Sequence, residues 1–227
     1  MDATNLRIIA RIKTDFDSKF GVPRQSGLVK NLMGTIVFEP EYRNPDALRG
    51  LEGFSHIWLV WQLSEAIVEG WSPTVRPPRL GGNKRMGVFA TRSPFRPNPI
   101  GLSSVKLEEI KTDPQYGTVL VVSGADLMDG TPIYDIKPYL AFTDSHPDAK
   151  GGFADDKFGD KLNVVFPDEL RKQIPCDKRD SLIEVLSQDP RPHYQDDPDR
   201  IYGMSFAGFD IRFKVDGDTL IVCKIKK

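Results

Sequence analysis

Apolar residues along this chain fall in short runs separated by turn-forming residues, a pattern typical of proteins built mainly from β-strands. The run Ser55–Leu63 is nearly continuous and rich in β-branched and aromatic residues, so it predicts a buried central strand. A short helix is predicted at Pro45–Gly53, with Asn44 as its N-cap. Further strands are predicted at Leu6–Lys13, Gly34–Glu39, Gly87–Thr91, Ile100–Ile110 and Thr118–Ala125.

The order of these elements predicts a mainly β fold. Strands this frequent, with one short helix among them, do not form βαβ units, and no GxGxxG motif follows a strand. We therefore expect residues 1–145 to form a single-sheet antiparallel β-barrel. The composition of residues 146–165 predicts a linker or loop, and residues 166–227 are expected to form a small α+β domain. Its predicted elements are helices at Pro167–Gln173 and Arg179–Ser187 and a hairpin of Phe209–Val215 with Thr219–Ile225 around Asp216 and Gly217.

Composition narrows the class of protein. The chain has 227 residues, 39% hydrophobic and 28% charged, as in an ordinary globular protein. It has no apolar run of membrane-spanning length and no signal peptide, so we expect a cytoplasmic protein without a membrane partner. Cys176 and Cys223 lie far apart, and no histidine has a second ligand at metal-binding spacing, so no metal site is expected.

Positive charge is concentrated in one stretch. Seven cations and no carboxylate lie from Trp71 to Lys106, although the net charge of the chain is −1. Within this stretch, three prolines among residues 94–99 stiffen the loop that carries Arg92, Arg96 and Asn98. A rigid loop of this kind suits an anion or a polar planar ligand, and the alternative is a solvated face beside a strand end.

Further polar clusters lie at predicted strand ends or in loops, where binding residues concentrate. They are Pro23 to Gln25, Asp126 to Pro132, Asp135 to Tyr139, and Asp189 to Arg191 in the C-terminal part. The turn at Asp129 and Gly130, taken alone, indicates only a hairpin. No GxSxG, HExxH or Walker A motif is present, so the sequence favours a polar binding site without a nucleophilic or metal-assisted constellation.

Five ordered motifs together resemble the TrmO family, also described as TsaA-like or YaeB-like. They are PRQ, RPPRLGGN, GVFATRSPFRPNPIGLS, DGTPIYDIKPY and DPRPHY, and they cover nearly the whole chain. The resemblance implies an S-adenosylmethionine-dependent tRNA methyltransferase. Its implied product carries a methyl group on the N6 nitrogen of threonylcarbamoyladenosine, next to the anticodon of threonine tRNA. The resemblance also implies a single-sheet β-barrel that works as a homodimer.

The motif positions of the family imply roles for individual residues. Asp126, Asp135 and Lys137 are the candidates to assist removal of the N6 proton, and Tyr139 offers an aromatic face to the sulfonium. Arg85, Arg96 and Arg191, with Arg92, would bind the threonyl carboxylate and the phosphates, and Asn98 resembles an amine-binding residue of other adenine methyltransferases. Contacts with S-adenosylmethionine are implied for Pro23, Arg24, Gln25, Ser64, Glu65, Arg92, Leu102, Asp129, Gly130, Thr131 and Pro132.

Two other functions are compatible with the same residues. A non-catalytic RNA-binding barrel would bind the anticodon loop of tRNA through the cationic stretch without a methyl donor. An S-adenosylmethionine enzyme acting on a small molecule would use the same cations as an anion pocket. Salt-dependent tRNA binding that depends on Arg92 or Arg96 would exclude the small-molecule alternative.

Overall fold

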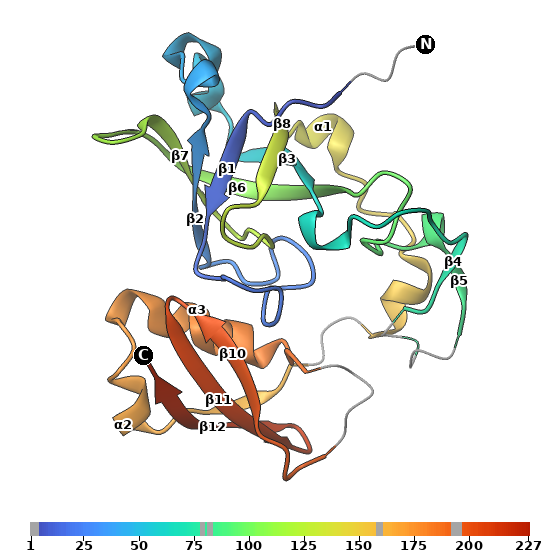
Figure 1. Ribbon diagram of the computed structural model, residues 1–227, viewed down its shortest axis with the longest axis vertical. Helices are drawn as coiled ribbons and strands as arrows, with labels where there is room; N and C mark the ends of the chain where they lie inside the picture. Colours follow the sequence, from blue (N-terminus) through green and yellow to red (C-terminus); the bar gives the residue numbers. More distant parts are fainter. Residues whose placement is uncertain (1–4, 78–79, 81–83, 158–160, 192–196) are drawn as a thin grey trace.

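The computed structural model describes residues 5–77, 80, 84–157, 161–191 and 197–227 (Figure 1). Six strands of the N-terminal part form a closed barrel in the order β1-β2-β7-β6-β3-β8, and β8 pairs back onto β1. All six pairings are antiparallel, and the mainly β character predicted from the sequence is confirmed. The strands are β1 (Ala10–Lys13), β2 (Met33–Phe38), β3 (His56–Gln62), β6 (Ile100–Asp113), β7 (Gly117–Ser123) and β8 (Pro132–Pro138).

Alternating side chains fill the barrel. Inward positions on neighbouring strands carry aliphatic residues such as Ile36, Leu59 and Leu120, each with no exposed surface. Ser103 of β6 occupies one of these inward positions, pairs with Leu59, and is also fully buried. A hydroxyl in such a core needs a hydrogen-bond partner, which marks this end of the barrel as polar.

Two local predictions from the sequence are wrong. The strand predicted at Gly87–Thr91 is only β5 (Met86–Gly87), paired with β4 (Thr74–Val75), and the chain then turns into a 3-10 helix at Val88–Ala90. The turn buries Val88 and leaves Phe89 72% exposed, so the apolar run does not belong to a sheet.

The helix predicted at Pro45–Gly53 consists of two 3-10 segments, at Pro45–Leu48 and Leu51–Gly53. The first segment ends because Arg49 is extended, and Gly50, with a φ of 91°, precedes the second segment. The Asn44 side chain does accept a hydrogen bond from the Asp46 amide, as expected of an N-cap. Further 3-10 segments lie at Pro40–Tyr42, Ser64–Ala66 and Gly152–Lys157, and a short helix, α1, spans Ala141–Asp144.

The C-terminal part is a four-stranded sheet with helices, in the order β10-β11-β12-β9. The predicted hairpin is present as β11 (Phe209–Asp216) and β12 (Thr219–Lys226), and β10 (Tyr202–Phe206) adds to its edge. On the other side, β9 (Asn163–Val165) pairs in parallel with β12, so the end of the expected linker contributes a strand to this sheet. The helices are α2 (Asp168–Arg171) and α3 (Cys176–Ser187).

The connection between β1 and β2, residues 14–32, joins the two halves of the molecule. Phe16, Val29 and Leu32 of this connection are buried in the same hydrophobic core as residues of α3 and β10 to β12. Phe16 packs edge-on against Phe206 of β10, with 5.4 Å between ring centroids. In Figure 1 the connection lies between the barrel and α3. Among the described residues, no helix is long and apolar enough to cross a membrane.

Candidate functional site

Residues 14–32 are held against the barrel by backbone contacts at two glycines. The Gly27 amide donates to the Gly124 carbonyl at 2.8 Å, and the Gly124 amide donates to the Leu32 carbonyl at 2.9 Å. Gly124 has a φ of 77°, and a Cβ at this position would lie 3.4 Å from the Gly27 backbone. Only glycine suits both the backbone angle and the close approach. This contact places Arg24 to Ser26 over the segment that follows β7.

Arg24, Gln25 and Arg92 form one polar network. Arg92 donates from Nη1 to Gln25 Oε1, and Gln25 Nε2 donates to the Arg24 carbonyl. Arg92 follows the 3-10 helix at Val88–Ala90, so the network joins the cationic stretch to residues 14–32. Residues from two separate motifs that were expected at one site are therefore in contact.

Asp126 extends this network into the barrel interior. Ser103 donates to Asp126 Oδ1 at 2.5 Å, and Trp61 Nε1 donates to Ser103 Oγ at 3.0 Å. Burial raises the pKa of the Asp126 carboxyl; the hydrogen bond from Ser103, those from the amides of Asp126 and Ser26, and the charge of Arg92 only partly oppose this shift. A buried carboxyl with a raised pKa is suited to accept a proton during a reaction.

The Trp61 ring packs against the backbone of Gly101, which has no side chain, on the neighbouring strand β6. A Cβ on Gly101 would lie 2.2 Å from Trp61 Cε2, so the indole rests directly on the glycine backbone. Trp61 and Gly101 are direct partners in the β3–β6 ladder. Gly101 thus determines the position of the indole N–H that binds Ser103.

The C-terminal domain contacts the network through the turn after α3. Arg24 Nη2 donates to the carbonyl of Asp189 at 3.1 Å and to that of Arg191 at 3.4 Å. Arg191 in turn forms a two-point ion pair with the Asp189 carboxylate, at 2.9 and 3.0 Å. Asp189 has a φ of 49°, an uncommon conformation for a residue other than glycine and one found more often at functional sites. The last three residues of the DPRPHY motif, 192–194, lie outside the described residues, as do residues 195 and 196.

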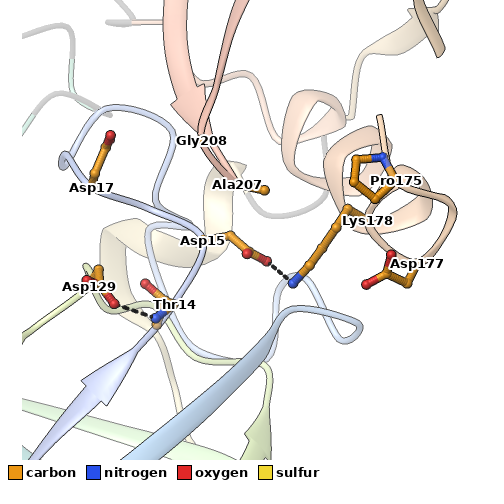
Figure 2. Close-up of a pocket in the computed structure, with 9 residues that line it drawn as sticks. All are labelled: Thr14, Asp15, Asp17, Asp129, Pro175, Asp177, Lys178, Ala207 and Gly208. Carbon is orange, nitrogen blue, oxygen red and sulfur yellow. Dashed lines mark hydrogen bonds and ion pairs between the residues drawn. The ribbon is translucent and has the colours of Figure 1, made fainter. Parts of the chain in front are cut away.

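The turn at Asp129–Pro132 lies at the edge of a cavity between the domains. Asp129 Oδ1 accepts from the Thr14 amide at 3.0 Å, and the Asp129 amide donates to the Phe16 carbonyl at 2.7 Å. Thr131 and Pro132 are buried at the start of β8, and Gly130 has a φ of 73°. Figure 2 shows the cavity, whose volume is about 450 Å³. Its lining residues are Thr14, Asp15, Asp17, Asp129, Pro175, Asp177, Lys178, Ala207 and Gly208.

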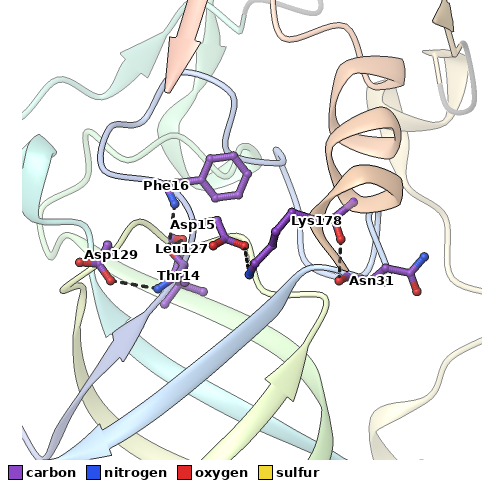
Figure 3. Close-up of polar contacts among 8 residues, drawn as sticks. Thr14, Asp15, Phe16, Asn31, Leu127, Asp129 and Lys178 are labelled. Atoms are coloured by element: carbon purple, nitrogen blue, oxygen red, sulfur yellow. Dashed lines mark hydrogen bonds and ion pairs between the residues drawn. The ribbon is translucent and has the colours of Figure 1, made fainter. Parts of the chain in front are cut away.

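An ion pair and a hydrogen bond fix residues 14–32 to α3 (Figure 3). Lys178 Nζ lies 2.6 Å from Asp15 Oδ2, and both side chains are largely buried. Ser181 Oγ donates to the Asn31 carbonyl at 2.9 Å. The C-terminal domain therefore determines the position of the segment that carries Arg24 and Gln25.

Other residues predicted for the site lie on the outer face of the barrel. Asp135 pairs with Val60 in the ladder and Lys137 with Trp58, while the neighbouring Leu59 and Ile136 positions alternate with them toward the core. Asp135 and Lys137 form an ion pair at 2.9 Å, and Tyr139 packs against Trp58 with 5.6 Å between ring centroids. The structure therefore does not bring these three side chains to Asp126.

Three of the four predicted RNA-binding residues, Arg85, Arg96 and Asn98, lie in the segment 71–98, here called the basic arm. Arg96 donates from Nη1 to the carbonyls of Val88 and Thr91, at 3.2 and 2.7 Å, so its guanidinium fixes the arm backbone. Arg85 donates to Thr74 Oγ1 at 3.2 Å, and Asn98 is exposed. At the rim of the barrel, Ser64 and Glu65 form an exposed 3-10 turn, and Leu102 is 57% exposed on the outer face of β6.

Sequence reasoning missed Ser26, Ser103 and Trp61, which all contribute to the surroundings of Asp126. Ser103 had a detectable signal, because it occupies an inward position of an alternating strand two residues before the buried Val105. Ser26 contributes only its backbone amide, which sequence does not distinguish from any other. Within the described part of the chain, no group of three or more His, Cys, Asp or Glu residues could hold a metal ion.

Two family models match the chain in succession. The tRNA-methyltransferase O N-terminal domain matches residues 11–145, and the TrmO C-terminal domain matches residues 159–227. The chain belongs to the TrmO family. The family resemblance predicted from the motifs is confirmed, and the matches divide the chain where the structure changes from the barrel to the second sheet.

Known TrmO proteins match the chain over most of its length. A protein of Escherichia coli named tRNA (adenine(37)-N6)-methyltransferase is 44% identical over 95% of this chain and 94% of its own length. A protein of the same name from Eikenella corrodens is 49% identical over 72% of this chain and 92% of its own. A crystal structure of TrmO from Pseudomonas aeruginosa superposes with a TM-score of 0.80 at 31% identity, and the match covers all of both chains.

Proposed function

We propose that this chain is an S-adenosylmethionine-dependent tRNA (adenine-N6)-methyltransferase whose catalytic domain is the six-stranded barrel. The observation that carries the proposal is the successive match of both TrmO domains, together with full-length relatives that bear this activity in their names. The network of Gln25, Arg92 and Asp126 adds a site of suitable chemistry.

The side chains of this site suit S-adenosylmethionine, which combines a carboxylate with two cationic groups. Arg24 and Arg92 offer cations to a carboxylate, and Gln25 offers an amide to a polar group such as the ribose or the adenine. Asp129, which lines the cavity between the domains, and Asp126 offer negative charge to an ammonium or a sulfonium. Both charge signs are thus present, as the ligand requires, and we propose that Pro23 to Gln25, Arg92 and Asp129 to Pro132 hold it.

The reaction requires alignment more than activation. S-adenosylmethionine supplies an electrophilic methyl group on sulfur, and its transfer leaves a neutral thioether. Residues of the network would hold the methyl donor and the acceptor adenine together, and such positioning would remove much of the barrier. Burial raises the pKa of the Asp126 carboxyl, which would accept the proton that N6 loses on methylation. The positive charge of Arg92 opposes this rise in the pKa of Asp126.

We further propose that the accepting base is threonylcarbamoyladenosine beside the anticodon of threonine tRNA. The carbamoyl group makes N6 a poor nucleophile, so a base such as Asp126 is needed. The threonyl carboxylate needs a cation such as Arg92. Bases of an anticodon loop are unpaired and reach a protein site without disruption of a duplex. We also propose a homodimer, and a cytoplasmic location where its tRNA substrate is found.

The test is methyl transfer from labelled S-adenosylmethionine to threonine tRNA that carries, or lacks, the threonylcarbamoyl group. We expect label only on the carbamoylated tRNA, and expect it lost when Arg92 is changed to Ala.

Calorimetric binding of S-adenosylmethionine to the protein alone distinguishes this function from the two alternative functions. Binding of tRNA without binding of S-adenosylmethionine would favour a non-catalytic RNA-binding barrel, and a bound methyl donor without salt-dependent tRNA binding would favour a small-molecule substrate. Sedimentation of the purified chain tests the dimer.

A further inference from the structure

The basic arm exposes large aromatic side chains to solvent. Trp71, Phe89 and Phe95 are 53%, 72% and 53% exposed, although burial of such rings stabilises a fold more than burial of other side chains. The rings of Trp71 and Phe89 lie together, with 5.9 Å between centroids and 31° between planes. Solvent-exposed aromatic clusters of this kind mark interaction surfaces.

The backbone under these rings is fixed. Val88, next to Phe89, is buried, and its amide donates to the Pro73 carbonyl at 2.9 Å. The Thr91 amide and hydroxyl both donate to the Val88 carbonyl, at 3.2 and 2.9 Å. Arg96 binds the same carbonyl, and its guanidinium lies 5.9 Å from the centre of the Phe89 ring. Phe89 is therefore presented on a rigid turn, not left on a loose loop.

The charges around the rings indicate what kind of partner would bind them. Every charged residue from Trp71 to Lys106 is a cation, and Arg85, Arg92 and Arg96 lie in the described part of the arm. A partner with flat apolar surfaces and negative charge complements aromatic rings set among cations. Unpaired RNA has this composition, with a π-face on each base and a phosphate at each step. A protein partner would cover the rings but would leave this excess of cations without counterparts.

We propose that Trp71 and Phe89 form a stacking platform for unpaired nucleobases that flank the target adenosine in the anticodon loop. The platform rests on the proposed tRNA substrate and adds a recognition surface to it. Arg92 is only three residues from Phe89 and contacts Gln25, so the platform adjoins the proposed methyl-transfer site. If the flanking bases stack on the arm, the target adenosine between them would be free to enter the methyl-transfer site.

The experiment measures binding of a synthetic anticodon stem–loop to the full chain by fluorescence anisotropy. Phe89→Ala and Trp71→Ala should each weaken binding about 10-fold, the effect of losing one base–aromatic stack. Phe89→Tyr should bind as the native chain, whereas Phe89→Leu, which keeps apolar bulk without a flat face, should bind as Phe89→Ala. The slope of log affinity against log salt should not change, because no phosphate contact is removed. Phe142→Ala is the matched control, since Phe142 is 88% exposed on α1, outside the arm.

Several outcomes would overturn the platform. Full binding by Phe89→Ala and Trp71→Ala, while the native chain methylates tRNA, would reject the platform and leave the proposed function intact. Rescue by Phe89→Leu would mean apolar docking instead of stacking. Conversion of a native dimer to monomer by either substitution, seen by sedimentation, would mean that a second copy covers the rings. Loss of S-adenosylmethionine binding along with RNA binding would mean that the rings support the structure of the methyl-transfer site, and would reject a separate stacking role. Failure of the native chain to bind or methylate any tRNA would instead reject the proposed function.

Discussion

The burial of Asp126 has opposite effects on catalysis and on the stability of the fold. Its burial beside Ser103 raises the pKa of the carboxyl above that of the unfolded chain, so the ionised form is held at a cost to stability. That same shift makes the carboxylate a better proton acceptor. Replacement of Asp126 should therefore change both the rate of methyl transfer and the stability of the fold.

We expect Asp126→Asn to reduce methyl transfer by about 10²- to 10⁴-fold, as for loss of a general base. Asn accepts the Ser103 hydrogen bond without a buried charge, so the variant should melt at a higher temperature than the native chain at pH 7. The raised pKa stabilises the native chain fully below the pKa of the unfolded chain, and this contribution is lost as pH rises through the folded-state pKa. The advantage of the variant should therefore shrink at acidic pH.

Calorimetric melting curves at several pH values and single-turnover rates test this expectation. The rate of the native enzyme should rise with pH on its acidic limb, where Asp126 ionises. Asp135→Asn, on the outer face of the barrel, is the control, since the exterior carboxylate should affect neither measurement as strongly. A normal rate in Asp126→Asn would assign proton removal to another group.

Gly101 gives a second prediction at this scale. In Gly101→Ala, the new methyl group would clash with the Trp61 ring, and overpacking of this kind costs about 1–3 kcal/mol. The displaced indole should also release Ser103 and slow methyl transfer. The double variant with Trp61→Phe should recover part of the lost stability, measured by urea unfolding, because the smaller ring leaves room. Additive losses in the double variant would show that the two residues do not interact.

The sequence patterns predicted those strands and turns that form through contacts between residues close together in the chain. The β11–β12 hairpin and the long strands β6 and β7 follow from alternation and turn residues, and they are present. The apolar run at Gly87–Thr91 failed as a strand, because it turns to expose Phe89, a ring whose proposed partner is not part of the chain. The motifs predicted the residues of the Gln25–Arg92 contact, but not the burial of Phe16 in the other domain's core. That contact joins segments nearly two hundred residues apart, which no local pattern reveals.

The connection 14–32 is the element whose position we expect to control methyl-donor binding. Lys178→Met removes the ion pair with Asp15 and leaves a largely buried carboxylate. We expect the KM for S-adenosylmethionine to rise roughly 10-fold with kcat little changed, because Arg24 and Gln25 lose their alignment while Asp126 keeps its own. Lys178→Arg should restore the native KM. Lys172→Met, on the exposed surface beyond α2, is the control. An equal fall in kcat and kcat/KM would place the defect in the chemical step instead.

The barrel has a core of its own, whereas the core of the second sheet includes residues from the β1–β2 connection. Side chains from residues 14–32 complete the core of the C-terminal domain, and that domain returns contacts from Lys178, Ser181 and the Asp189–Arg191 turn. The C-terminal sheet and residues 14–32 therefore lack part of their apolar partners without each other, while the barrel core is complete. Cooperative unfolding is expected because the connection that follows β1 is part of the C-terminal core.

The full chain should accordingly unfold in one thermal transition, with equal calorimetric and van't Hoff enthalpies. A fragment of residues 1–157 retains all six barrel strands but leaves Phe16, Val29 and Leu32 without their buried partners. We expect this fragment to melt at a lower temperature and to bind S-adenosylmethionine at least 10-fold more weakly, because its Arg24 and Gln25 are no longer fixed. Phe16→Ser in the same fragment removes an exposed ring and should improve its solubility, whereas in the full chain it should destabilise the fold. Tight methyl-donor binding by the fragment would show that the barrel alone aligns the site and that the C-terminal domain acts elsewhere.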